Sequence, residues 1–435
     1  MAEEALILSK PEKSTFCTTQ LTGSKSESNR ALILNALSKG KVEVRNLSSA
    51  DDTVTLNAIL EVRKTESQKD RKIEAAAAVT SGLADLPASG LPTVNIGPAG
   101  TAMRFLTAYF ATTGQEVVLT GTERMKQRPI GILVDALTSL GAQIEYVEKE
   151  GFPPLKFQST FTQKTNKISI KGNISSQFIT ALLLVAPSLP QGLELTIEGE
   201  LTSRPYVEMT LAMLEEAGIS HKWNGAVISI PAQEFKSSTI TVEPDWSAAS
   251  YWYAIAALSE ESSISLPYLK QNSLQGDSRI SQIMESFGIS TKFTAEGLEL
   301  TKTTSEIKGD FFDLKDCPDL AQTVIVVSAA LGHNATFTGL ETLKIKETDR
   351  VAALQNELAK IGVKLNEENE HYHLDCSQLH FPDKITIKTY EDHRMAMAFA
   401  PLALKINQLE IEEPAVVGKS YPAFWEDLKK AEFEF

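Results

Sequence analysis

Hydrophobic residues along the chain are concentrated in six runs that combine helical spacing with many small side chains. The runs begin near Ser28, Thr101, Ser176, Ser247, Asp319 and Asp392. By subtraction, successive starts lie 73, 75, 71, 72 and 73 residues apart. A constant period of this length indicates a supersecondary unit used repeatedly, here six times.

Each run is followed by the same succession of patterns. A short strand-like stretch such as residues 41–44 or 192–197 comes first, then a polar loop and a second amphipathic helix. Alternating stretches such as residues 371–374 then predict paired strands. Glycines that can adopt a left-handed C-cap follow four of the second helices. They are Gly141, Gly218, Gly288 and Gly362.

The repeat predicts an α/β protein made of six βαβαββ-type units, three in each of two domains. We expect a first domain at residues 23–244 and a second at residues 1–22 plus 245–435, with the active site in the cleft between them. The first residues are expected to supply a strand to the second domain. Residues 61–92 interrupt the period and predict a helix and an exposed loop inserted in the first unit.

Composition narrows the functional class. Lys plus Arg is 42 and Asp plus Glu is 56, so the net charge is −14, which disfavours a nucleic-acid partner. No apolar run reaches membrane-spanning length, and the N-terminus has no secretory pattern. Three scattered cysteines, Cys17, Cys317 and Cys376, predict neither a disulfide framework nor a metal site. We expect a cytoplasmic protein, a monomer, without metal or cofactor and without a membrane partner.

Polar residues of particular types open the six helical runs. Ser24, Ser175, Asp245 and Asp392 are residue types that cap helices, and capping alone can explain each of them. If the repeats are pseudo-symmetric, however, the helix N-termini of a domain lie on one face. Their free N–H groups and dipoles then suit a bound anion, especially a phosphate.

Cations are concentrated at the same junctions, although the protein is acidic. Those near the helix starts and in the following loops are Lys25, Arg30, Arg104, Arg124, Lys126, Arg128, Arg204, Lys344, Lys346, Arg350, Arg394 and Lys419. Solvated helix ends would explain Lys126. The mixed segment 346–350, between two apolar stretches, is more typical of a site for a small molecule with several negative charges.

Two carboxylates, Asp319 and Glu347, lie at junctions of the fifth unit and should be close together. An acid among several bases is held ionised and can accept a proton. Asp319 could equally be a plain N-cap. Cys317 has no histidine at an interpretable spacing and is a poor candidate for a nucleophile. The segment 97–100 lacks the spacing of a nucleotide-binding loop.

The junction motifs together resemble a known family. They comprise residues 23–30, 99–104, 124–130, 175–178, 346–350, 392–396 and 418–420. With them the chain resembles the 5-enolpyruvylshikimate-3-phosphate synthases, which are enolpyruvyl transferases, and the match runs in order over essentially the whole chain. The resemblance implies an inverse α/β barrel-like fold of two domains that close over the substrates.

The resemblance also implies the reaction. The enolpyruvyl group of phosphoenolpyruvate would pass to the 5-hydroxyl of shikimate 3-phosphate, in the shikimate pathway to chorismate and the aromatic amino acids. Asp319, Glu347 and Lys25 would be catalytic: Asp319 takes the hydroxyl proton, while Lys25 and Glu347 transfer protons at the enolpyruvyl carbons.

Substrate-binding residues are implied in the same way. Those for shikimate 3-phosphate are Lys25, Ser26, Arg30, Ser175, Ser176, Gln177, Ser203, Tyr206, Asp319, Thr342 and Lys346. Those for phosphoenolpyruvate are Lys25, Gly100, Arg124, Gln177, Arg350, Arg394 and Lys419.

The chain departs from the family pattern at three positions. The family usually has asparagine where this chain has Pro98, and often asparagine and proline at the positions of Thr342 and Phe105. Two alternatives stay open. One is the sister transferase that uses UDP-N-acetylglucosamine, although its usual reactive cysteine is missing from residues 98–140. The other is a non-catalytic protein that binds phosphorylated metabolites.

Overall fold

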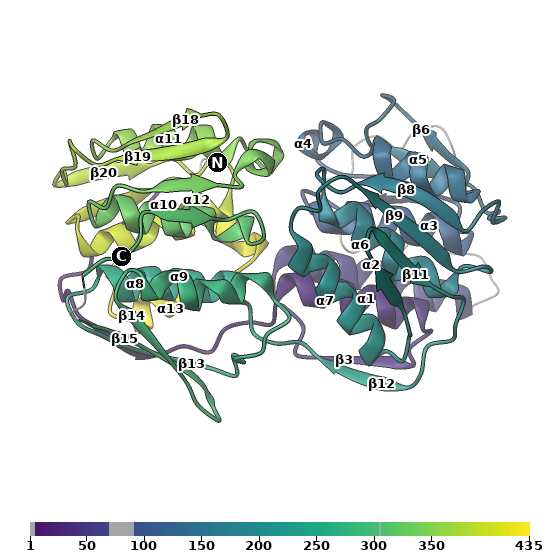
Figure 1. Cartoon of the computed structure of the whole chain (residues 1–435), viewed down its shortest axis with the longest axis horizontal. Coiled ribbons are helices and arrows are strands. Elements are labelled where there is room, and N and C mark those ends of the chain that lie inside the picture. Colours follow the sequence, from purple (N-terminus) through teal and green to yellow (C-terminus); the bar gives the residue numbers. More distant parts are fainter. Residues whose placement is uncertain (1–4, 69–90, 304–305) are drawn as a thin grey trace.

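The computed structural model describes residues 5–68, 91–303 and 306–435. Figure 1 shows two halves side by side, one formed by the chain from α1 to β12 and the other mainly by its C-terminal part. The insertion expected at residues 61–92 begins as a helix, because α2 extends to Gln68. The expected loop at residues 69–90 lies outside the described residues.

The six hydrophobic runs are helices, as predicted. They form α1 (Lys25–Leu37), α3 (Gly100–Thr113), α6 (Ser176–Val185), α8 (Trp246–Leu258), α10 (Ala321–Ala330) and α12 (His393–Phe399). Every residue of α10 and α12 is buried, and α8 is buried except at Ser247. A helix that is apolar on all sides belongs inside a domain. These helices therefore form the interior, and the sheets lie around them.

The second amphipathic helices are also present. They are α2 (Asp51–Gln68), α5 (Gly131–Leu140), α7 (Arg204–Glu216), α9 (Ile280–Glu285), α11 (Arg350–Ala359) and α13 (Phe424–Lys430), with the short α4 (Glu123–Lys126) before α5. All four predicted glycines have positive φ, from 76° at Gly362 to 117° at Gly141. A Cβ at Gly141 would collide with the carbonyl oxygen of Thr162, so only glycine fits this cap.

Four sheets share one strand order, which is the structural counterpart of the sequence period. In each, two parallel strands lie side by side, a buried helix directly precedes the second of them, and a hairpin is added to that second strand. In the first half, one sheet has the order β4 (Thr93–Asn95), β5 (Val117–Thr120), β7 (Leu155–Phe157), β6 (Ile144–Tyr146), and another has the order β8 (Lys167–Lys171), β9 (Leu193–Glu198), β11 (Val227–Ile230), β10 (Lys222–Asn224). In the second half, one sheet has the order β2 (Thr15–Thr18), β13 (Ser262–Pro267), β15 (Gly297–Lys302), β14 (Ile289–Phe293), and another has the order β16 (Phe311–Asp313), β17 (Thr336–Thr338), β19 (His371–Asp375), β18 (Lys364–Glu368).

The chain crosses twice between the halves, once after β2 and once after β12. The N-terminal β2 runs parallel to β13 of the second half, which confirms the strand expected from the first residues. Conversely β12 (Ser238–Thr241), just before the second half begins, runs parallel to β3 (Val42–Arg45) of the first half. The N-terminal β1 (Leu6–Leu8) pairs with β21 (Gln408–Ile411), which also pairs with β20 (Lys384–Ile387).

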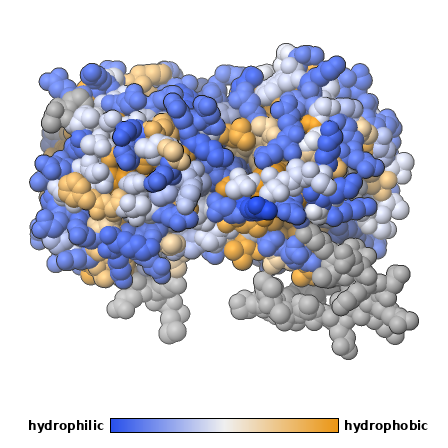
Figure 2. Space-filling view, turned by 90° about the horizontal axis from the view of Figure 1, so that it is seen from below, coloured by the Kyte–Doolittle hydropathy of each residue, from blue (hydrophilic) through white to orange (hydrophobic). Residues whose placement is uncertain are grey.

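Buried hydrophobic side chains form two clusters. One contains residues between Ala31 and Val242. The other contains Leu8, Leu21 and residues between Trp246 and Phe433. Among the described residues, no helix is both long enough and apolar enough to cross a bilayer. Seen from below, the surface is largely hydrophilic, with hydrophobic side chains in small groups (Figure 2).

A buried acidic pair lies where β12 leads into the second half. Oε2 of Glu27 accepts a hydrogen bond from the backbone N–H of Glu243 at 3.0 Å, while Oε1 has no partner. Burial raises the pKa of Glu27 to about 7; the Glu243 N–H bond opposes this shift and the Glu243 charge adds to it. The folded protein therefore holds a proton on Glu27 that the unfolded chain releases above pH 4.5.

Replacement of this acid should change how stability depends on pH. As pH rises from 4.5 to 7, Glu27 ionises in the unfolded chain but stays protonated in the folded protein. The unfolding free energy of the wild type therefore falls by up to about 3 kcal/mol. Glu27→Gln removes this loss. Urea unfolding at pH 5 and pH 8 should show the variant gaining stability relative to wild type at the higher pH. If the stability of the variant differs from that of wild type by the same amount at pH 5 and pH 8, the raised pKa assigned to Glu27 is wrong.

Candidate active site

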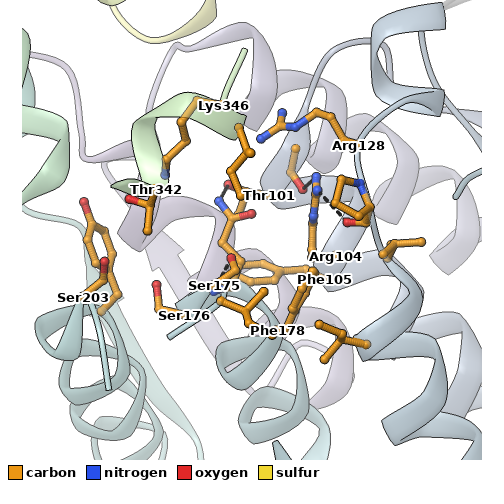
Figure 3. Close-up of a pocket in the computed structure, with 18 of the residues that line it drawn as sticks. Thr101, Arg104, Phe105, Arg128, Ser175, Ser176, Phe178, Ser203, Thr342 and Lys346 are labelled. Atoms are coloured by element: carbon orange, nitrogen blue, oxygen red, sulfur yellow. Dashed lines mark hydrogen bonds between the residues drawn. The ribbon is translucent and has the colours of Figure 1, made fainter. Parts of the chain in front are cut away.

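A cavity of about 410 Å³ lies between the two halves and is lined by both of them. Most of the predicted site residues border it. They are Lys25, Ser26, Arg30, Gly100, Ser175, Ser176, Gln177, Ser203, Tyr206, Asp319, Thr342, Lys346, Glu347 and Arg350. Figure 3 shows Thr342 and Lys346 approaching from the second half, with Ser175, Ser176 and Arg128 on the first half.

Helix starts of the first half form one wall of this cavity. Residues at the N-termini of α1, α3 and α6 all border it, which agrees with the pseudo-symmetric arrangement expected from the repeat. Ser24 and Ser175 do cap their helices, accepting bonds from the N–H groups of Glu27 and Gln177. Lys25, Ser26 and Ser176 come directly after these caps and border the cavity, and Ser175 both caps α6 and borders the cavity.

Ser203 has the least usual backbone of the predicted site residues. Its φ of 56° and ψ of 40° place it in the left-handed region immediately before α7. Serine adopts this conformation at a cost, and such residues are common where a side chain must be aimed at a site. Ser203 and Tyr206, in the first turn of α7, both border the cavity.

Asp319 is the centre of an ionic cluster rather than a helix cap. Arg394 Nη2 donates to its Oδ2 at 2.7 Å, and Arg350 Nη1 donates to its Oδ1 at 3.3 Å. The Tyr206 hydroxyl of the other half donates to Oδ2 at 3.4 Å. Burial alone would raise the pKa of Asp319. The positive charges of Arg394, Lys346, Arg350 and Lys25 outweigh burial and hold this pKa well below its usual range.

Glu347 lies in a second group of cations. Arg350 Nη2 donates to its Oε2 at 2.9 Å, and Lys419 Nζ lies 2.9 Å from its Oε1. Burial opposes ionisation here too, but Lys419, Arg350 and Arg128 keep the pKa of Glu347 well below its usual range. Both predicted carboxylates are thus ionised and share the guanidinium of Arg350. The structure brings them together as the repeat predicted.

Three predicted cations are not in the cavity wall. Arg394 lies behind Asp319, and Lys419 bonds Glu347 and donates to the carbonyl oxygen of Pro98 across the cleft. The exposed Arg124 donates to the carbonyl oxygens of Lys346 and Glu347, and so joins the two halves at the rim.

Arg128 lines the cavity, although its place in the sequence indicated only a junction cation. It borders the cavity, is 8% exposed, and its Nη1 lies 3.8 Å from Glu347 Oε1. Its Nε has no partner within the described part of the chain. Arg124 and Arg128 belong to the same motif, four residues apart. The position of Arg128 in the motif was available from sequence, but its orientation was not.

Thr101 and Arg104 also border the cavity and were not among the predicted binding residues. Gln177 Nε2 donates to the Thr101 hydroxyl at 3.2 Å (Figure 3). Arg104 donates to the carbonyl oxygens of Gly100 and Pro129, which fixes the first turn of α3 against the following loop. Within the residues that the structure describes, no group of three or more His, Cys, Asp or Glu side chains could hold a metal ion.

Comparison with known proteins gives the family. The family model described as EPSP synthase (3-phosphoshikimate 1-carboxyvinyltransferase) matches residues 13–428. The chain belongs to the EPSP synthase family. A curated 3-phosphoshikimate 1-carboxyvinyltransferase from Bacteroides fragilis is 46% identical over 419 residues, covering 96% of this chain and 95% of the relative. Another from Pectobacterium atrosepticum is 36% identical, covering 98% and 99%.

Solved structures have the same fold. An EPSP synthase from Acinetobacter baumannii has a TM-score of 0.75 at 19% identity, covering 99% of this chain and 100% of that one. An enolpyruvyl transferase from Streptomyces tendae has a TM-score of 0.69 at 15% identity, covering 100% and 98%. These solved structures have the α/β fold of two halves that the sequence predicts, so the fold prediction is confirmed.

Cysteine chemistry is disfavoured in this member of the family. Burial raises the pKa of the Cys317 thiol to about 12 and that of Cys376 to about 11, and it also raises that of Cys17. At neutral pH all three are therefore thiols and poor nucleophiles.

Replacing Cys17, Cys317 and Cys376 together with serine or alanine should leave kcat/KM within about threefold of wild type, because thiols this poorly ionised have no covalent role. Steady-state kinetics on the triple variant would measure this, with circular dichroism to verify folding. A folded but inactive triple variant would restore the covalent-cysteine hypothesis.

Proposed function

We propose that this protein transfers the enolpyruvyl group of phosphoenolpyruvate to the 5-hydroxyl of shikimate 3-phosphate and releases phosphate. The product, 5-enolpyruvylshikimate 3-phosphate, leads to chorismate and the aromatic amino acids. The main support is the cavity itself, in a chain that belongs to the EPSP synthase family throughout its length. Two ionised carboxylates lie in it among cations from both halves, as two phosphorylated substrates require.

Asp319 is the proposed general base for the 5-hydroxyl. An ionised carboxylate can accept a proton, and the positive charges of Lys346 and Lys25 help to keep Asp319 ionised. As the hydroxyl oxygen bonds to C2 of phosphoenolpyruvate, its proton passes to Asp319 and another proton reaches C3. Loss of a proton from C3 and cleavage of the C2–O bond to phosphate then restore the double bond. Lys25 and Glu347 are proposed for the transfers at C3.

The two substrates are assigned to different parts of the cavity. Shikimate 3-phosphate is proposed to lie between the first-half wall, formed by Lys25, Ser26, Arg30, Ser175, Ser176, Gln177, Ser203 and Tyr206, and the second-half residues Asp319, Thr342 and Lys346. Phosphoenolpyruvate is proposed to lie beside Lys25, Gly100, Gln177, Arg350, Arg394 and Lys419. For its remaining cation we propose Arg128 in place of Arg124, because Arg128 borders the cavity and Arg124 bonds backbone carbonyls at the rim.

The division into two closing bodies remains a proposal, with boundaries at residues 23–244 and at 1–22 plus 245–435. It is supported by the two separate hydrophobic clusters and by the few contacts that cross the cavity. Since one chain supplies all the proposed substrate contacts, we propose that the monomer is the active form, in the cytoplasm.

Of the alternatives, the shikimate acceptor is favoured over a UDP-amino sugar by the family match and by the relatives' names. Phosphate release from phosphoenolpyruvate, measured with shikimate 3-phosphate and separately with the UDP-sugar acceptor, tests this choice. If phosphate is not released with either acceptor, only a binding function is left.

Replacing the proposed base should separate binding from turnover. Asp319→Asn keeps the shape of the side chain but cannot accept the hydroxyl proton, so kcat should fall by about 10² to 10⁴. Shikimate 3-phosphate binding, measured by titration calorimetry, should change little. The control is Asp313→Asn, whose exposed carboxylate accepts bonds from Thr338 and Lys315 outside the cavity. Near-wild-type turnover of Asp319→Asn would remove it from this role.

The two arginines four residues apart allow a matched comparison. Arg128→Ala removes a buried cation from the cavity wall, and Arg124→Ala removes an exposed cation from the rim. We expect the first to raise KM for phosphoenolpyruvate by about 30-fold or more, the usual value of a charge-assisted hydrogen bond. The second should have a smaller effect. If Arg124→Ala is the more damaging, the original sequence assignment is correct.

A further inference from the structure

Arg30 is a buried cation whose partners in the protein are neutral. Its Nε donates to the Thr210 hydroxyl at 2.9 Å and its Nη1 to the Ser26 carbonyl oxygen at 2.8 Å. Its Nη2 donates to the Thr180 hydroxyl at 3.3 Å and the Tyr206 carbonyl oxygen at 3.2 Å. Within the described residues, no carboxylate forms a salt bridge with this guanidinium, which is 3% exposed. Burial outweighs the charge of Glu27, which favours the charged form of Arg30, and lowers the pKa of Arg30 to about 10, so this cation needs a further source of stabilisation.

Two aromatic rings supply it. The guanidinium carbon of Arg30 lies 5.7 Å from the ring centroid of Phe105 and 5.8 Å from that of Tyr206. A cation within about 6 Å of a ring centroid is attracted by the negative face of the ring, and this attraction strengthens when water is excluded. Phe105 is 1% exposed and lies on α3, whereas Arg30 is on α1 and Tyr206 on α7. The arrangement thus joins three different repeat units.

The hydrogen-bond pattern leaves part of the guanidinium available. Arg30 has five N–H donors, and the four bonds above use one of the two on Nη1. Both Arg30 and Phe105 border the cavity, as does Ser26, which accepts the Nη1 bond through its backbone. One charged N–H is therefore left for an anion in the cavity.

We propose that Phe105 is a positioning residue for shikimate 3-phosphate: its ring, with that of Tyr206, stabilises the charge of Arg30 without a salt bridge to a carboxylate, so that this charge stays available to the substrate. The proposal rests on the proposed function of the cavity. A carboxylate in the place of Phe105 would also stabilise Arg30, but it would neutralise the charge and repel the anionic substrate. An aromatic ring avoids both effects.

Fluorinated phenylalanines at position 105 test the proposal. Each added fluorine withdraws electron density from the ring face and weakens its attraction for a cation, with little change in ring shape. With 4-fluoro-, 3,5-difluoro- and 3,4,5-trifluorophenylalanine, the Kd for shikimate 3-phosphate should rise stepwise, reaching about 3-fold to 10-fold. We expect kcat and the KM for phosphoenolpyruvate to stay within about twofold, since Arg30 is assigned to the other substrate.

The same series at Phe110 is the matched control. Phe110 is on the same helix, is buried, and packs edge-on against Tyr109 and Phe157 rather than against a cation. Fluorination there should leave the Kd for shikimate 3-phosphate unchanged. A similar rise at both positions would show a packing effect and overturn the proposal.

Two further outcomes at position 105 would also overturn it. If the ring face touches the anionic substrate directly, fluorination would tighten binding instead of weakening it. If the ring only fills space, Kd would stay constant along the series. Phe105→Leu gives an independent check, because leucine fills the apolar site but has no aromatic ring. This substitution should raise the Kd for shikimate 3-phosphate at least as much as the trifluoro variant does. Failure of the unmodified protein to bind shikimate 3-phosphate would refute the proposed function itself.

Discussion

The guanidinium of Arg350 determines how the second half presents its site. It is 2% exposed and bonds three carboxylates: Asp392, Glu347 and Asp319. Asp392 caps the start of α12, Asp319 precedes α10, and Arg350 is itself the first residue of α11. One side chain thus holds the starts of three helices together. Burying these charges is costly, and the cost is offset only because each has a well-placed partner.

The same cluster explains why the two proposed catalytic acids are ionised although both are buried. Asp319 is shared by Arg350 and Arg394, and Glu347 by Arg350 and Lys419. Each cation also has carboxylates to bond in the present arrangement. Anionic substrates would therefore compete with existing carboxylates for these cations, and they bring enough negative charge to do so. Residues 346–350 contain charged side chains of both signs because the cations of this cluster must bond carboxylates of the protein and must also be able to bond anionic substrates.

Much of the fold could be predicted because it depends on local rules. The six helices follow from apolar runs at a nearly constant spacing, and the left-handed glycines at 141, 218, 288 and 362 mark the ends of second helices. The strand that the first residues add to the second half was foreseen, but the sequence of a short strand such as Ser238–Thr241 does not specify its partner. The expected loop at residues 69–90 stays untested.

The candidate site was predictable at the level of motifs and less so at the level of orientation. Asp319 could be a cap or an acid on sequence alone, and only its bonds to Arg350 and Arg394 decide between them. Likewise Arg124, within α4, reaches the rim, whereas Arg128, just after α4, borders the cavity, and the motif alone does not show this difference. That difference depends on packing between segments more than 200 residues apart, such as Arg124 and Lys346.

The pairing of the N-terminal β2 with the second half has a consequence for how the chain is made. During synthesis, β2 leaves the ribosome before any of the first half, yet its partner β13 begins only at Ser262. At about 5 to 20 residues per second, the interval is roughly 10 to 50 s. For that time the nascent chain holds an unpaired strand with an exposed edge while the first half folds around α1, α3 and α6. The first half in turn receives its last strand, β12, only after all three of its buried helices have been made.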